Sequence, residues 1–167
     1  LRRGMTLPGL LTHRFQAAAG DECGIPTLRV LSWNMLGQFT LGGLMNGALL
    51  AKAARHYIAR YGTPDVIHAH QARWAGYGAM LAAREHGLPY VVTEHESYFA
   101  EGKIPDNDKP YLRDIYRGAS RVIAVSRAMS AAMHDVYDPG QITIIPNMVN
   151  TDYFDLPARP RPVDPFV

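Results

Sequence analysis

The sequence has a single cysteine, Cys23, among its 167 residues, so no disulfide can form within the chain. A lone thiol suits a reducing compartment. The sequence also contains no run of about 18 apolar residues, which is the length that a transmembrane helix requires. Its charge is nearly balanced, because 17 Lys and Arg against 15 Asp and Glu give a net charge of +2. This balance does not support a nucleic-acid-binding protein.

Several catalytic and nucleotide-binding motifs are also missing. Neither Gly-x-Gly-x-x-Gly nor a Walker A sequence occurs, and Gly42-Gly43 alone does not make a phosphate loop. Ser126 follows a predicted strand and precedes a predicted helix, as the nucleophile of many hydrolases does. That nucleophile lies between glycines, whereas Ala124 and Ala128 stand at those positions here. We therefore expect Ser126 to cap the helix, although the same helix end also offers free N–H groups to an anion.

What the chain does contain is a regular alternation of short apolar runs and helical periods. The clearest run is Tyr90–Val92, because it is short, rich in β-branched residues and preceded by Gly87 and Pro89. Runs of this kind predict strands at residues 27–32, 65–70, 90–94, 122–125 and 142–145. Helical periods between the runs predict helices at residues 44–61, 76–86, 108–119 and 126–136.

The alternation predicts the fold class, an α/β domain with a Rossmann-like parallel sheet and helices on both faces. No hairpin signal interrupts this pattern. Residues 1–24 have no sustained period and indicate an irregular lead-in, and residues 25–154 make up the domain. Residues 155–167 are rich in proline and predict an extended linker. Residues 37–43 and 96–108 are predicted loops.

Polar side chains follow the predicted strands at their carboxyl ends, where ligands bind in open parallel sheets. These candidate site residues are His70, Gln71, Glu94, His95, Ser126 and Asn147. Glu94 and Glu96 would point the same way on an extended backbone. An acid and base pair is therefore an alternative to two solvated loop carboxylates.

Three histidines allow a different kind of site at the same edge. His68 and His70 are two residues apart on a strand and share a face, and His95 follows a neighbouring strand. Such a set can bind zinc. No carboxylate or cysteine clearly completes the ligand set, so we expect His68 to pack beneath a helix and His70 to cap the end of its strand.

Four segments together resemble the GT4 glycosyltransferases, which are retaining enzymes of the GT-B architecture. The segments are residues 64–70, residues 87–95 with Thr93-Glu94-His95 at their end, residues 119–126 and residues 145–154. They follow one another at sensible spacing, and the similarity covers roughly residues 24–167. The family's last motif reads Pro-Asn-Gly, whereas Met148 follows Pro146-Asn147 here.

The resemblance implies two Rossmann-like domains that face a cleft, with this chain as most of the N-terminal, acceptor-binding domain. A missing C-terminal domain, starting at the linker, would bind the nucleotide-sugar donor, so this chain alone would be inactive. His95 would be the catalytic residue that contacts the transferred sugar, and Ser126 and Asn147 would line the cleft. No metal and no other cofactor is expected, because helix termini and basic side chains stabilise the leaving phosphate.

The implied function is transfer of a sugar, of hexosyltransferase type, from a nucleotide sugar to a glycan or lipid-linked acceptor, as in polysaccharide biosynthesis. The expected location is the cytoplasm, with peripheral contact at the inner face of the membrane left open. Two alternatives remain, a metal-dependent hydrolase built on His68, His70 and His95, and a non-catalytic binding module. The family's first strand is also missing, so the strand at residues 65–70 should have an unpaired edge.

Overall fold

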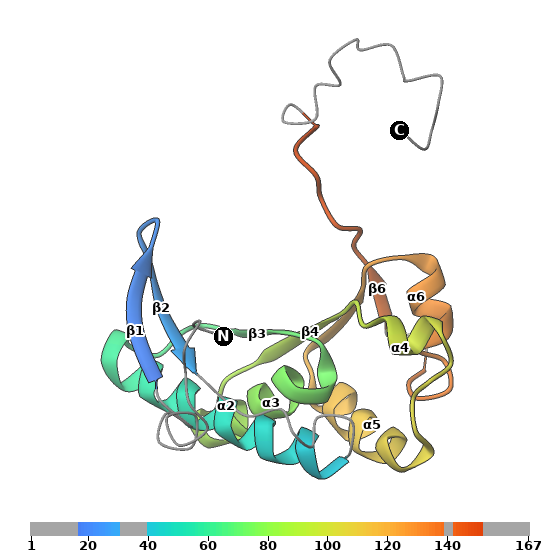
Figure 1. Ribbon diagram of the computed structural model, residues 1–167, viewed down its shortest axis with the longest axis horizontal. Coiled ribbons are helices and arrows are strands. Elements are labelled where there is room, and N and C mark those ends of the chain that lie inside the picture. The colour runs from blue at the N-terminus through green and yellow to red at the C-terminus, as the bar shows by residue number, and fades with distance from the viewer. Residues whose placement is uncertain (1–16, 31–39, 139–141, 152–167) are drawn as a thin grey trace, which may run out of the picture.

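The computed structural model describes residues 17–30, 40–138 and 142–151. These residues form a four-stranded sheet flanked by helices and a separate two-stranded hairpin (Figure 1). The elements in chain order are β1 Ala17–Glu22, β2 Ile25–Val30, α2 Thr40–Tyr61, β3 Ile67–His70, the π-helix η1 Ala72–Gly76, α3 Tyr77–His86, β4 Tyr90–Glu94, α4 Ser97–Ala100, the 3₁₀ helix η2 Asp106–Asp108, α5 Lys109–Gly118, β5 Arg121–Ala124, α6 Arg127–Ala132 and β6 Ile142–Ile144.

The main sheet has the strand order β3-β4-β5-β6, and every neighbouring pair is parallel. This arrangement confirms the predicted α/β fold with a parallel sheet flanked by helices. The strands lie within two residues of the predicted ranges 65–70, 90–94, 122–125 and 142–145. In the described part of the chain β3 forms one edge of this sheet, as expected for the strand at residues 65–70.

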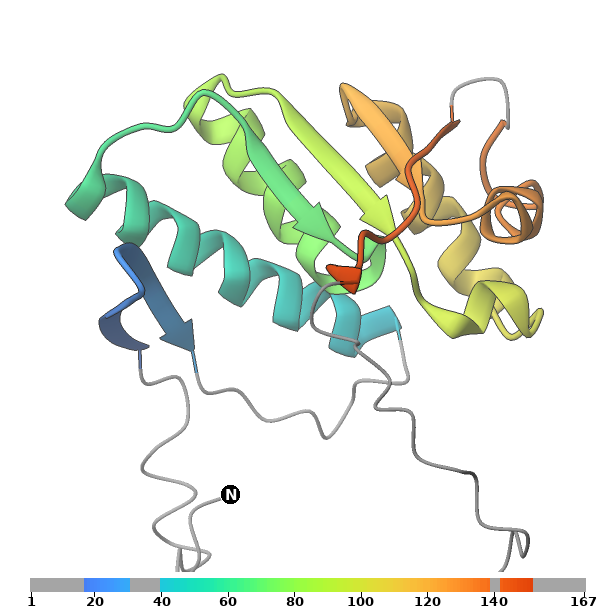
Figure 2. The same cartoon turned by 90° about the horizontal axis from the view of Figure 1, so that it is seen from above.

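Helices α2, α3 and α5 lie on one side of the sheet, and α6 lies beside its β6 edge (Figure 1). Seen from above, the strands lie in front of α3 (Figure 2). Side chains on the opposite face of the sheet, such as His68 and Arg121, are exposed. Among the described helices, none is both long and apolar enough to cross a membrane.

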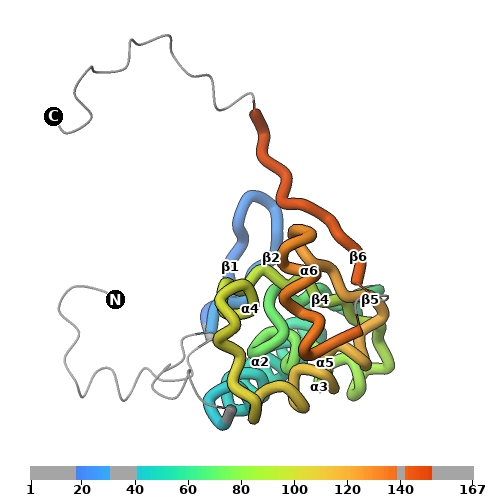
Figure 3. Tube along the Cα trace, turned by 90° about the vertical axis from the view of Figure 1, so that its right-hand side faces the viewer, coloured from blue at the N-terminus to red at the C-terminus, as the bar shows by residue number. Residues whose placement is uncertain are grey.

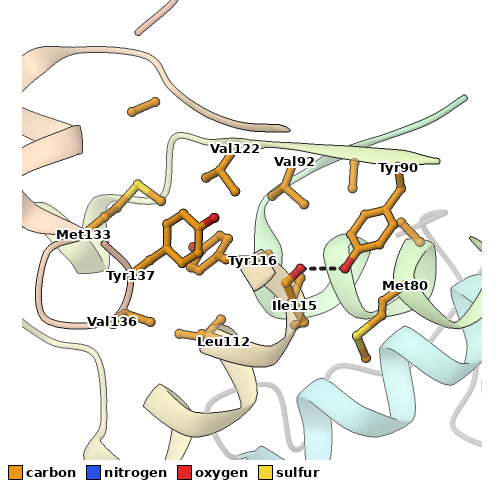
Figure 4. Close-up of a cluster of buried hydrophobic side chains, with 14 of the residues drawn as sticks. Met80, Tyr90, Val92, Leu112, Ile115, Tyr116, Val122, Met133, Val136 and Tyr137 are labelled. Carbon is orange, nitrogen blue, oxygen red and sulfur yellow. Dashed lines mark hydrogen bonds between the residues drawn. The ribbon is translucent and has the colours of Figure 1, made fainter. Parts of the chain in front are cut away.

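The main core lies between the sheet and α5 (Figure 4). Val92 of β4 and Val122 of β5 are fully buried and lie over Ile115 and Tyr116 of α5. Met133, directly after α6, belongs to the same core. Burial of one such side chain contributes about 1.5–3 kcal/mol. The apolar side chains that predicted the strands therefore form the surface on which the helices pack.

Helix α2 starts at Thr40, so the prediction of a loop over residues 37–43 is wrong for its last residues. The helix includes Gly47, where an added Cβ would lie 2.5 Å from Tyr77 Cδ1, and it passes Gly78, where an added Cβ would lie 2.8 Å from Leu50 Cβ. Glycine at these two positions lets α2 pack closely on α3. Close packing compensates the low helix propensity of glycine.

The strand predicted at residues 27–32 is present as β2, Ile25–Val30, but its predicted place in the parallel sheet is wrong. β2 instead pairs antiparallel with β1, which lies in the stretch expected to be irregular. The two strands are joined by Cys23 and Gly24, both of which have positive φ, 55° and 82°. Such turns match the twist of a hairpin, and Asp21 Oδ1 accepts a hydrogen bond from the Gly24 N–H at 2.8 Å. Residues 31 and 32 lie outside the described residues.

The segment at residues 96–108 was expected to be a loop and contains two short helices, α4 and η2. Other boundaries follow the prediction closely. Gly87 ends α3 with φ 66° in the left-handed region, and α6 begins after Ser126. After β6 the chain leaves the sheet (Figure 3). The domain limits at residues 24 and 154 remain predictions, and the linker at residues 155–167 lies outside the described residues.

Candidate functional site at the carboxyl edge of the sheet

Three imidazole rings form a row where β3 and β4 end. His70 pairs with Thr93 in the parallel register, which brings His70 next to the residues that follow β4. The ring centroids of His68 and His70 are 4.5 Å apart, and those of His70 and His95 are 5.6 Å apart. All three side chains are exposed to solvent. The structure therefore brings His70 and His95 together on an accessible edge.

His68 is the member of the row that is tied to the sheet. Its Nε2 lies 2.8 Å from Thr93 Oγ1 on the neighbouring strand. Burial, together with the nearby His70, lowers the pKa of His68 from its ordinary value of 6.5. The expectation that His68 packs beneath a helix is wrong, because its side chain lies on the exposed face of the sheet.

Glu94, at the end of β4, is fully buried and accepts four hydrogen bonds. Its Oε1 accepts the backbone N–H groups of His95 and Glu96, each at 3.0 Å. Its Oε2 accepts the N–H of Ala72 at 3.0 Å and the hydroxyl of Tyr116 at 2.8 Å. A direct contact between this carboxylate and a substrate would require the loss of these bonds. The sequence placed Glu94 at the edge but did not predict that its side chain turns inward.

Gln71, directly after β3, has φ 71° and ψ 134°, an unusual conformation for a residue with a side chain. Its N–H donates to Thr93 O at 2.9 Å, and its carbonyl oxygen accepts from the Gly76 N–H at 2.9 Å. Strain of this kind costs about 1–3 kcal/mol and is concentrated at functional sites. The π-helix η1 follows at once, and π-helical turns are also frequent at such sites. The predicted site residue Gln71 therefore has a strained backbone conformation directly before a π-helix.

Glu96 is a second carboxyl group beside the imidazole row, and it is half-buried. Burial and the charge of Glu94 raise the pKa of Glu96 above its ordinary value, and the nearby Arg73 and His95 oppose this shift. Burial and Glu94 also raise the pKa of the Tyr116 hydroxyl well above its ordinary value. Glu94 and Glu96 do not form a matched acid and base pair, since Glu94 is closed off from solvent.

A buried ion pair links the segment after β3 to the segment after β4. Arg73 Nη2 donates to Asp108 Oδ2 at 2.6 Å, and the guanidinium lies 5.8 Å from the ring centre of Tyr98. The hydroxyl of Tyr111 also donates to the Arg73 carbonyl oxygen. Asp108 was expected to cap α5; it occupies the N-cap position, but its side chain makes no capping bond there. No local sequence signal indicates the pair, because its partners come from different segments.

Ser126 and Asn147 are the other predicted site residues. Ser126 follows β5, which ends beside β4, since the Val125 N–H donates to Glu94 O at 3.4 Å. Ser126 Oγ accepts the Met129 N–H at 3.0 Å, which confirms the predicted helix cap. Asn147 is exposed on the segment that leaves the sheet after β6 (Figure 3). The described structure thus groups His70, Gln71, Glu94 and His95, and leaves Asn147 on a separate segment.

A hollow of about 360 Å³ lies between α5 and the turn after α6, and none of the three histidines of the imidazole row lines it. Arg113, Arg117 and His134 line it together with Asp135 and Asp138, so both signs of charge are present. Within the residues that the structure describes, no group of three or more His, Cys, Asp or Glu side chains is arranged to hold a metal. The imidazole row therefore differs in geometry from the zinc site considered above.

The comparison with known families decides among the remaining interpretations. The family model described as Glycosyltransferase Family 4 matches residues 10–153. The chain belongs to this family. The match includes β1 to β6 and the whole imidazole row, so the glycosyltransferase domain contains the site described above. Neither the hydrolase nor the binding-module alternative is favoured by this membership. No curated protein matches this family 4 chain.

Proposed function

We propose that the protein is a retaining glycosyltransferase that transfers a sugar, of hexosyltransferase type, from a nucleotide-sugar donor to a glycan or lipid-linked acceptor. The process served would be polysaccharide biosynthesis. Family membership supports transfer of a sugar. The observation that carries the proposal is the exposed His95 at the end of the central strand, 5.6 Å from His70 between ring centroids.

In this proposal each edge residue has a separate task. His95 hydrogen-bonds the transferred sugar and orients it where positive charge develops in the transition state. His70 and Gln71 bind the acceptor beside it, at the end of the neighbouring strand. Alignment of donor and acceptor supplies much of the rate of such a reaction. Ser126 and Asn147 contribute at the border of the cleft, and no metal or other cofactor takes part.

We also propose that this chain is the acceptor-side half of a two-domain GT-B enzyme. Apolar side chains that follow β6 support this, since Ile145 is 50% exposed and Met148 is 96% exposed. Exposed apolar residues that lie close together mark surfaces that bind another protein surface. A nucleotide-binding domain would cover them. Calorimetry on the 167-residue chain should then detect no sugar-nucleotide binding, and micromolar affinity would contradict this division of labour.

A contact with the membrane surface is the last part of the proposal, together with a cytoplasmic location. Helix α2 has no acidic residue, while Lys52, Arg55 and Arg60 are exposed along it. Leu41 and Met45 are 58% and 54% exposed near its first turns. Cationic and apolar side chains of this kind bind anionic lipid surfaces.

The deciding experiment is a transfer assay on the intact enzyme with a panel of nucleotide sugars and membrane-extracted acceptors. NMR of the purified product gives the anomeric configuration. A product with the configuration of the donor supports the proposal. An inverted product contradicts the retaining mechanism, and hydrolysis without transfer contradicts the transferase function.

A further inference from the structure

The buried carboxylate of Glu94 joins the two loops that carry the edge residues. One oxygen, Oε1, accepts from the first two N–H groups after β4, those of His95 and Glu96. The other oxygen, Oε2, accepts from Ala72, the second residue after β3. A single side chain, itself 0% exposed, therefore bonds to both loops.

A fourth donor anchors this carboxylate to the core. The Tyr116 hydroxyl donates to Glu94 Oε2 at 2.8 Å. Tyr116 belongs to α5 and is also 0% exposed, and its ring packs among the core side chains shown in Figure 4. Through Tyr116, the two loops are thus also attached to the core of the domain and not only to each other.

Both loops need such support. Gln71, next to Ala72, has the positive φ of 71°. The N–H of Gln71 is held by Thr93 O, and the N–H of Ala72 is held by Glu94, so two consecutive amides are fixed by β4. On the other side, His95 has its backbone fixed by Glu94 while its ring lies exposed beside His70.

We propose that Glu94 is a positioning residue of the transfer reaction, which fixes the backbone of His95 directly and that of Gln71 through its neighbour Ala72, and does not touch substrate. This inference rests on the proposed function and adds a buried residue that affects the reaction through the residues it positions. All four partners of Glu94 are donors, so a carboxylate can accept from each of them. A glutamine amide accepts through one oxygen only and turns its NH₂ group toward two donors.

The test compares Glu94→Gln with Glu85→Gln in the intact enzyme. Glu85 is an exposed glutamate that pairs with Arg55, so its change controls for loss of a carboxylate elsewhere. We expect Glu94→Gln to lower kcat roughly 10- to 100-fold with little change in the donor KM, since small misplacement of reacting groups has effects of this size. Glu85→Gln should leave both parameters unchanged.

A double-mutant cycle with His95→Ala separates positioning from a general loss of stability. If Glu94 acts through His95, Glu94→Gln should lower kcat by less than about threefold in the His95→Ala background, because coupled residues are not additive. An equal loss in both backgrounds would overturn the proposal. So would a kcat within twofold of the parent in a folded Glu94→Gln enzyme, as judged by its circular dichroism.

A milder variant covers the case in which Glu94→Gln does not fold. Tyr116→Phe removes one donor to Oε2 and leaves the ring in the core. It should lower kcat severalfold and also fail to add to His95→Ala. Its control is Tyr57→Phe, which removes an exposed hydroxyl bonded to Pro26 O. An unchanged kcat in Tyr116→Phe would overturn the proposal.

Amide hydrogen exchange tests the positioning role without a measurement of enzyme activity. In Glu94→Gln the amides of Ala72, His95 and Glu96 should exchange at least about tenfold faster, while those of Val92 and Val122 in the strands stay protected. A parent enzyme that transfers no sugar would contradict the proposed function and leave these exchange rates as expected. Unchanged exchange at the three amides would contradict the positioning role itself.

Discussion

Arg73 and Asp108 form an ion pair between segments that lie 35 residues apart in the sequence. The pair is 2.6 Å long, and the two side chains are 8% and 2% exposed. Arg73 belongs to η1, behind β3, and Asp108 closes the segment that starts at Glu96. The pair therefore fastens the polypeptide that follows His95 to the loop that follows His70.

The first prediction concerns the stability that depends on this pair. Asp108→Ala leaves the Arg73 guanidinium buried without its carboxylate, and we expect it to lower the free energy of unfolding by about 3–5 kcal/mol. The double variant Arg73→Met with Asp108→Leu should lose less, because neither residue then leaves a buried charge. Urea unfolding of both proteins measures the difference. Equal losses would show that the unpaired buried guanidinium is not the source of the loss.

The sheet could be predicted from the sequence because its strands are locally distinctive. Tyr90–Val92 is apolar and β-branched, and it is bounded by Gly87 and Pro89 on one side and by polar residues on the other. Local patterns of this kind indicate strand and helix without knowledge of tertiary contacts. The same reasoning failed at β1, where Ala17, Ala18, Ala19 and Gly20 have low strand propensity. The pairing with β2 decides the structure there.

The site was predicted less completely than the fold. Strand ends correctly placed His70 and His95 at one edge, because parallel strands share their carboxyl side. Strand alternation puts Glu94 on the same face as Val92. Its hydrogen-bond partners could not be predicted, since Ala72 and Tyr116 are each 22 residues away in the sequence. The local sequence around a carboxylate that binds a ligand does not differ from that around a carboxylate that holds two loops together.

The second prediction is that His95 contributes directly to transfer. His95→Ala should lower turnover of the intact enzyme by about 10²-fold or more, which is the effect of losing one donor to the transition state. His134→Ala, a change at an exposed histidine after α6, is the control. Steady-state kinetics decide the matter. Turnover within a factor of two of the parent would leave His95 as a residue that only ends the strand.

The third prediction uses the strained backbone at Gln71. Gln71→Gly relieves the positive φ, and we expect a gain of about 1 kcal/mol in the free energy of unfolding after the entropy cost of glycine is subtracted. Transfer should nevertheless become slower, because the side chain proposed to hold the acceptor is lost, and the acceptor KM should rise. A variant that is stabilised and fully active would show that the side chain has no role in binding.

The fourth prediction follows from the lowered pKa of His68. Its folded-state pKa lies below the ordinary 6.5, through burial and the nearby His70, so the unfolded chain binds the proton more strongly. The stability from neutral His68 is complete above pH 6.5 and is lost as the pH falls through the folded-state pKa.

Melting temperatures between pH 7 and pH 5 test this sign. The parent should lose more stability on acidification than His68→Gln, which keeps a partner for Thr93 but does not titrate. His134→Gln, at an exposed position, is the control for loss of one imidazole. Identical pH profiles for the parent and His68→Gln would show that His68 has the same proton affinity in both states.

The last prediction tests the contact of α2 with anionic lipid. Lys52 and Arg60 are exposed on a helix without acidic residues, and each cation near an anionic surface contributes about 1 kcal/mol to binding. Lys52→Ala with Arg60→Ala should therefore weaken sedimentation of the intact enzyme with phosphatidylglycerol vesicles by roughly 25-fold at low salt. Lys103→Ala removes a cation that already pairs with Glu101 and should have little effect. Salt should weaken binding of the parent in the same assay, because screening acts on surface charges. Binding that is equally strong to neutral phosphatidylcholine vesicles, or that does not change in the double variant, would remove α2 as the membrane-facing element.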